Sequence, residues 1–218
     1  MVRFAWLVFA IVASAVLLVA SMPPARFHIL GWLYLVPVWL ALRGHRSSVA
    51  LVSGIMLGLV AAFISSEGWF YSERVPSESA GWLLLLFSLF GLVNGVVFVL
   101  ISRGMPVWQV ACGAVVCEGL TLVEIPVHAA LSQYQSGAML GFASLGGIWL
   151  VSGLVWLMNG LIAGAITDRR WPVLGLLGLI VAAFSIPAGP GTEGTLRVAL
   201  CQFAEPTVET ITSSLDRA

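Results

Sequence analysis

Long apolar segments follow one another along most of this chain of 218 residues. The longest lies within residues 128–165, where a short polar turn (132–136) leads into an apolar run that only Asn159 and a few Ser and Gly residues interrupt. A helix that crosses a membrane needs ~20 predominantly apolar residues. The pattern therefore predicts an all-α polytopic membrane protein with about seven transmembrane helices, at 4–22, 28–42, 49–65, 81–101, 107–127, 139–167 and 171–188.

The composition excludes a soluble domain, because 60% of the residues are hydrophobic and only 9% are charged. Ten basic residues, all of them Arg, balance ten acidic ones, so the net charge indicates no nucleic-acid partner. The sequence contains no Gly-rich phosphate loop and no Cys or His spacing typical of a metal site. We therefore expect no cofactor and no metal.

Two of the predicted spans should be irregular. Segment 28–42 is short and contains Pro37, which predicts either a kink or a start near Pro24. Segment 139–167 is long, so it should be tilted or broken at its Gly146-Gly147 pair. The first segment could instead be a cleaved signal peptide, but its apolar run is long for one, which favours a retained helix.

The arginines between the predicted spans indicate an orientation. With the N-terminus inside, the outer loops hold Arg26 and Arg74. The inner segments then hold six arginines: Arg3, Arg43, Arg46, Arg103, Arg169 and Arg170. This bias follows the positive-inside rule and predicts a cytoplasmic N-terminus and a periplasmic C-terminus in a bacterial inner membrane.

Two loops on the predicted outer side carry most of the polar character. Loop 66–80 joins three glutamates to an aromatic run that includes Trp69 and Tyr71. The second loop is the polar turn, with Gln133 and Tyr134. These four residues are candidates for contacts with lipid or substrate, because functional side chains are often placed on loops.

Glu118 lies near the middle of the fifth predicted span, where a carboxylate costs ~2.5–3.5 kcal/mol on insertion scales. It is either a functional group or a protonated acid hydrogen-bonded to Asn94, Asn159 or Gln109, and no cationic partner is obvious in the neighbouring spans. Glu124 should reach the outer interface, where His128 either contacts it or is a plain interfacial histidine. Glu118 and Glu124 lie six residues, ~240°, apart on a helix, which excludes an acid/base pair.

Three pairs of glycines at a spacing of four residues create small-residue faces: Gly54 and Gly58, Gly91 and Gly95, and Gly160 and Gly164. Such faces let helices approach closely, either within one bundle or between two copies. We favour packing within the bundle and leave the oligomeric state open.

The composition changes after Ala188. Residues 189–195 are rich in Gly and Pro and predict a linker. Residues 196–218 have the composition of a strand, a turn and a helix, which cannot bury a core alone. The sequence thus divides into a bundle (1–188), a linker (189–195) and a truncated β–α start of a domain that these residues do not complete (196–218).

Several motifs, in the order in which they occur, resemble the bacterial apolipoprotein N-acyltransferase family. They are Pro24 followed by 31–42 (GWLYLVPVWLAL), Gly54…Gly58 followed by 68–71 (GWFY), 131–133 (LSQ) followed by 143–147 (ASLGG), and 197–202 (RVALCQ). The last of these looks like the first strand of the family's nitrilase-like domain. The resemblance covers nearly the whole chain.

The resemblance implies a membrane domain for an enzyme that moves an acyl chain from a phospholipid to the N-terminus of a lipoprotein. The family's catalytic Glu, Lys and Cys lie in the nitrilase-like domain, so none is expected in this chain, and Cys201 matches a core position of the first strand. We expect the 218 residues to be inactive alone, with membrane phospholipids and a lipoprotein acceptor as partners. The alternative is a non-enzymatic polytopic protein, either a small transporter-like bundle or the partner subunit of another membrane protein.

Overall fold

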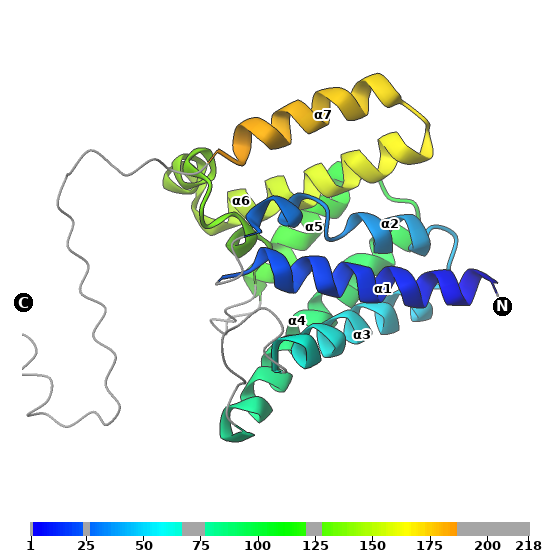
Figure 1. The fold of residues 1–218 in the computed structure, drawn as a ribbon. Helices are drawn as coiled ribbons and strands as arrows, with labels where there is room; N and C mark the ends of the chain where they lie inside the picture. The colour runs from blue at the N-terminus through cyan, green and yellow to red at the C-terminus, as the bar shows by residue number, and fades with distance from the viewer. Residues whose placement is uncertain (1, 24–26, 67–76, 121–127, 187–218) are drawn as a thin grey trace, which may run out of the picture. The chain divides into compact units, whose positions relative to one another are not determined.

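The computed structural model describes residues 2–23, 27–66, 77–120 and 128–186. Within these ranges the chain forms seven α-helices and two 3₁₀ helices (Figure 1). In chain order they are α1 (Val2–Ser21), η1 (His28–Trp32), α2 (Val36–Leu42), α3 (Ser47–Ser66), α4 (Ser77–Ser102), α5 (Val107–Leu120), η2 (Ala129–Gln133), α6 (Gly137–Thr167) and α7 (Trp171–Phe184).

The predicted all-α architecture is confirmed for the described residues, which contain no strand. Within the described ranges, four helices are long and apolar enough to span a membrane, at Arg3–Ser21, Ser47–Ser65, Leu84–Ser102 and Gly137–Thr167. Segments His28–Leu42, Val107–Leu120 and Trp171–Phe184 are apolar but shorter. The seven α-helices of the described residues agree with the predicted number of spans, but only four of them have the length that a membrane crossing needs. The expected strand and helix at 196–218 lie outside the described residues.

Helices α3 and α4 are packed together through glycine. A Cβ atom added at Gly54 would lie 2.2 Å from the backbone nitrogen of Gly95, and one added at Gly58 would lie 2.1 Å from the carbonyl oxygen of Phe87. Added at Gly91, it would lie 2.7 Å from the carbonyl oxygen of Gly54. The predicted small-residue faces of these two helices therefore pack within the bundle, backbone against backbone. We call this contact the glycine seam.

The second predicted span is broken rather than kinked. It consists of η1, a turn at residues 33–35, and α2, which has Pro37 in its first turn. Proline suits this position, because its missing N–H would have no helical partner there. Asn159 of α6 bridges the break: its Oδ1 accepts from the Leu35 N–H at 2.9 Å and its Nδ2 donates to the Gly31 carbonyl at 3.1 Å. In an apolar surrounding, such side-chain partners are what make a broken helix tolerable.

Helix α6 is interrupted at Gly147, whose φ of 68° and ψ of −169° are not helical. This confirms the predicted irregularity at the glycine pair. Glycine suits the position, because a residue with a Cβ rarely adopts this conformation.

Successive helices run in opposite directions, so the helix ends fall into two groups (Figure 1). The arginine end holds Arg3, Arg43, Arg46, Arg103, Arg169 and Arg170; the polar-turn end holds His28, residues 128–136 and Ser185.

Candidate functional site

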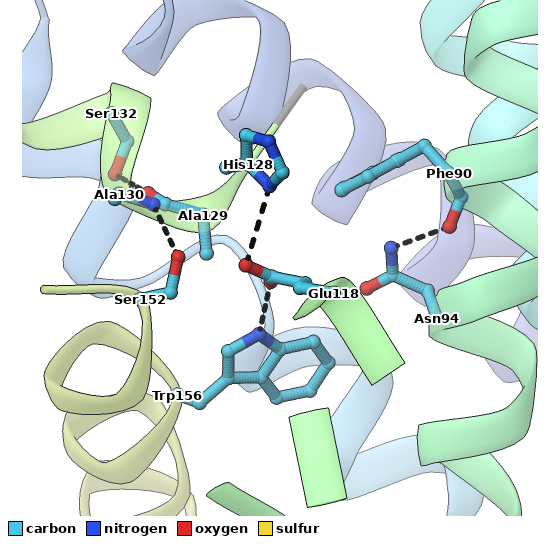
Figure 2. A network of polar contacts seen from close by, with 9 residues as sticks. All are labelled: Phe90, Asn94, Glu118, His128, Ala129, Ala130, Ser132, Ser152 and Trp156. Carbon is cyan, nitrogen blue, oxygen red and sulfur yellow. Dashed lines mark hydrogen bonds and ion pairs between the residues drawn. The ribbon is translucent and has the colours of Figure 1, made fainter. Parts of the chain in front are cut away.

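Glu118 lies in the last turn of α5 and is buried, with 4% of its surface exposed. The indole nitrogen of Trp156, on α6, donates a hydrogen bond of 3.0 Å to its Oε1. The Trp156 ring is itself buried and meets the edge of Phe98 from α4, with the centroids 6.4 Å apart. Three helices therefore position this carboxylate and one of its donors (Figure 2).

His128, the residue directly before η2, lies next to the same carboxylate. Its Nδ1 lies 3.6 Å from Oε2 of Glu118, which makes an ion pair when the imidazole is protonated (Figure 2). The ring also packs edge-on against Trp149 of α6, with centroids 5.3 Å apart and an interplanar angle of 86°. No cationic partner was expected in the neighbouring spans; His128 lies outside them, directly before η2, and becomes such a partner when it is protonated.

The amides expected to bond Glu118 have other roles in the structure. Asn159 serves the break in the second span, and the Nδ2 of Asn94 donates to the Phe90 carbonyl of its own helix at 2.8 Å. Gln109 lies on α5 itself, nine residues before Glu118 and so about 14 Å away along the axis. A donor that was not expected, the Trp156 indole, bonds the Glu118 carboxylate.

Gln133 anchors the polar turn against η1. Its Nε2 donates to the His28 carbonyl at 3.0 Å and to the Ser132 hydroxyl at 3.1 Å, and the side chain is 1% exposed. The turn comes so close that a Cβ at Gly31 would lie 2.2 Å from Ser132 Oγ. The structure thus gives Gln133 a packing role, and a contact with substrate stays a prediction.

The neighbouring residues extend this polar contact to α7. The Gln135 amide donates to the Tyr134 hydroxyl at 3.0 Å, and its Oε1 lies 3.1 Å from His28 Nδ1. His28 Nε2 lies 2.8 Å from the Ser185 carbonyl, just after α7. Ser136 caps α6 by accepting from the Met139 N–H at 3.1 Å. Tyr134 is half-buried, so part of it remains accessible at this end of the bundle.

The seven predicted site residues divide into three groups. The structure brings Glu118 and His128 together, and it places Gln133 and Tyr134 in the adjoining turn. Trp69, Tyr71 and Glu124 lie outside the described residues. A contact between His128 and Glu124 therefore stays a prediction.

An apolar groove of about 490 Å³ lies between α5 and α6, beside the cluster of Glu118, His128 and Trp156. Trp108 and Val116 on α5 and Trp149 and Leu157 on α6 are among its lining residues. Trp149 faces both the groove and the His128 ring. The lining of the groove is apolar, and its Trp149 side lies next to the His128 imidazole.

Sequence analysis missed three contributors to this site. They are Trp149, Ser152 and Trp156, all on α6; Ser152 Oγ accepts from the Ala130 N–H at 3.1 Å. The available signal was the Trp pair in an apolar run, because a buried indole N–H usually finds an acceptor. Its acceptor lies 38 residues earlier in the chain, which no local pattern reveals.

Chemically, this cluster holds the Glu118 carboxylate in an apolar surrounding, between an indole N–H and an imidazole ring. Among the described residues, no group of three or more His, Cys, Asp or Glu side chains could hold a metal ion.

The chain matches the family model described as "Apolipoprotein N-acyltransferase N-terminal domain" over residues 14–161. The match runs from α1 into α6 and includes the broken second span, the glycine seam, Glu118 and the polar turn. No curated protein matches the chain.

Proposed function

The chain belongs to the apolipoprotein N-acyltransferase N-terminal domain family, and from this we infer that it is the membrane domain of an apolipoprotein N-acyltransferase-like protein. In this proposal the bundle holds a phospholipid acyl donor and the lipid chains of a lipoprotein acceptor beside a nitrilase-like catalytic domain. The bundle itself supplies position and an apolar surrounding, and the catalytic domain supplies the nucleophile.

The observation that carries the proposal is the structure of the polar-turn end within the matched range. Buried hydrogen bonds fix the polar turn on η1 and α6, and Glu118 lies just beneath it with His128 and Trp156 as partners. A rigid polar platform at one end of an apolar bundle suits a domain that presents lipid head groups to chemistry above the membrane. The groove beside Trp149 would accept an acyl chain, since burial of each CH₂ contributes ~0.8 kcal/mol.

We further propose that all seven helical segments cross a bacterial inner membrane, with the arginine end in the cytoplasm. The three shorter segments would cross with the help of their flanking residues, and the arginine bias supplies the orientation. Reporter fusions at Arg170 and Gly191 should then indicate opposite sides of the membrane. Two reporters on the same side would contradict the topology.

The experiment that tests the function is a chimera. Residues 1–188 replace the membrane domain of an active apolipoprotein N-acyltransferase, and transfer of labelled acyl chains from phospholipid to a diacylated lipopeptide is measured. We expect the chimera to transfer acyl chains and the 218-residue chain alone to transfer none, because activation of a nucleophile needs an adjacent base.

The same assay separates the alternatives. A folded, membrane-inserted chimera without transfer, beside an active parent enzyme, would favour a transporter-like bundle or a partner subunit. Transfer by the 218-residue chain above a control without enzyme would show that the placement of the catalytic residues is wrong.

A further inference from the structure

The arginine end contains a cavity of about 410 Å³ between the start of α1 and the end of α2. Its lining residues combine three basic side chains with an apolar wall: Arg3, Arg43, His45, Trp6, Leu40, Ala41 and Gly44. Arg43 and Gly44 also line a second cavity of about 360 Å³ that reaches Ser102 and Val107 of α4 and α5. Arg43 thus stands between two hollows at the same end of the bundle.

No carboxylate neutralises this cavity within the described residues. The single acidic side chain described at the arginine end is Asp168, whose Oδ2 lies 3.5 Å from Arg170 Nε. Arg103 donates to the Ser47 hydroxyl at 3.4 Å and so is turned toward α3. Arg3 and Arg43 make no ion pair with any described residue. Two guanidinium groups and an imidazole therefore face one cavity with an uncompensated positive charge.

The cavity lies at the ends of two apolar segments, and this position indicates the environment of its ligand. Arg3 is the first residue of the apolar span Arg3–Ser21, and Arg43 directly follows the apolar segment His28–Leu42. Both charges thus lie where hydrocarbon gives way to head groups. Trp6, 47% exposed and stacked on Phe9 at 5.6 Å, is the kind of aromatic side chain that prefers this boundary.

From these observations we propose that the cavity of Arg3, Arg43 and His45 binds the phosphate of an anionic phospholipid. The arginines donate to the phosphate oxygens, because their planar forks suit that geometry. Trp6 and Leu40 contact the glycerol and the first methylenes of the chains. Basic pockets at helix ends are suited to such head groups. This site lies at the opposite end from the polar turn, and it does not depend on acyl transfer.

The test measures binding of fluorescent phosphatidylglycerol to the purified 218-residue chain in detergent micelles. Phosphatidylcholine and diacylglycerol with the same chains serve as the zwitterionic and the phosphate-free probes. We expect a clear preference for phosphatidylglycerol, and inorganic phosphate at millimolar concentration should compete weakly. Equal affinity for all three lipids, or displacement of the lipid by stoichiometric inorganic phosphate, would overturn the proposal.

Variants locate the preference. Arg3→Gln with Arg43→Gln should weaken phosphatidylglycerol binding roughly 25-fold, at roughly 5-fold for each arginine removed. The matched control, Arg46→Gln with Arg169→Gln, removes the same charge from the same end but from outside the cavity, and it should change binding less than about 3-fold by long-range attraction alone. Equal losses in both doubles would show a diffuse charge effect and refute the site.

A third variant separates the loss of charge from a loss of folding. Arg3→Lys with Arg43→Lys keeps the charge and should retain most of the lipid preference, while helix content and thermal stability are checked for every variant. A Lys pair that is folded and loses the preference as fully as the Gln pair would overturn the proposal.

Discussion

The glycine seam and the polar-turn end show two different ways of joining helices in an apolar bundle. At the seam, α3 and α4 touch through backbone atoms, and Gly54 and Gly95 leave no room for a single added carbon. At and next to the polar-turn end, side-chain hydrogen bonds from residues such as Gln133 and Asn159 join η1, α2, η2 and α6. The seam depends on missing side chains, whereas the polar-turn end depends on particular ones.

The difference follows from backbone hydrogen bonding. Helices α3 and α4 satisfy their own backbone groups, so only van der Waals contact is left to join them. The break between η1 and α2 frees N–H and C=O groups that find no water in an apolar interior, so a side chain must satisfy them. The polar-turn end therefore carries the buried side chains of Ser132, Gln133 and Ser136, and the candidate site lies next to it.

The largest effect should come from removing the side chain that satisfies this break. Asn159→Leu leaves the Leu35 N–H and the Gly31 carbonyl without a partner, at ~1–3 kcal/mol each, so the free energy of unfolding should fall by ~2–6 kcal/mol. It can be measured by denaturant unfolding in detergent micelles.

The control for Asn159 is Asn94→Leu, at a position that is equally buried. Asn94 donates to a carbonyl of its own helix, and its Oδ1 has no hydrogen-bond partner in the described part of the chain. Its replacement should therefore cost less than ~1 kcal/mol. Equal losses at both positions would mean that burial, not the break, sets the cost.

A smaller effect is expected at the glycine seam. Gly54→Ala places a carbon 2.2 Å from a backbone atom of α4, so the helices must separate, and overpacking of this kind costs ~1–3 kcal/mol. Gly164→Ala is the matched control, because no atom lies within 4 Å of its added carbon. There the higher helix propensity of Ala should raise stability by up to ~1 kcal/mol. Two neutral substitutions would contradict the close packing of the seam.

The Glu118 variants test whether the buried carboxylate belongs to packing or to function. Glu118→Leu strands the Trp156 indole N–H and should cost ~1–3 kcal/mol. Glu118→Gln keeps an acceptor for this N–H and should leave stability almost unchanged, with acyl transfer by the chimera also retained. A folded Gln variant that no longer supports transfer would show instead that the charge itself works.

Sequence patterns predicted the seam better than the polar-turn end, for a physical reason. A glycine pair at a spacing of four predicts close helix packing directly, because both glycines lie on the same helix face. The Gly164 position shows the limit of this reading, since its face remains open. Pro37 likewise marked the second span as irregular, but the break lies at residues 33–35, where Asn159 of α6 supplies the partners.

Contacts between residues far apart in the chain could not be predicted from sequence patterns. Asn159 lies 124 residues from Leu35, and Trp156 lies 38 residues from Glu118, so no periodicity links them. The local rule that pairs residues four apart suggested Glu124 for His128, whereas the structure places His128 next to Glu118. The composition could therefore identify the polar residues as candidates, but only the fold pairs them.

The smallest effect should be the energetic coupling between His128 and Glu118. Nδ1 of His128 lies 3.6 Å from Oε2 of Glu118, beyond hydrogen-bond distance, and only 14% and 5% of the two side chains are exposed. Both side chains are largely buried, so the cost of removing them from water offsets most of their attraction. A double-mutant cycle with Glu118→Gln and His128→Phe measures the coupling directly, and Phe keeps the edge-on contact with Trp149. We expect the two changes in unfolding free energy to add within ~1 kcal/mol. A coupling of ~2 kcal/mol or more would mean that the polar turn is held by charge, and that the polar-turn end differs from the seam even more than its hydrogen bonds indicate.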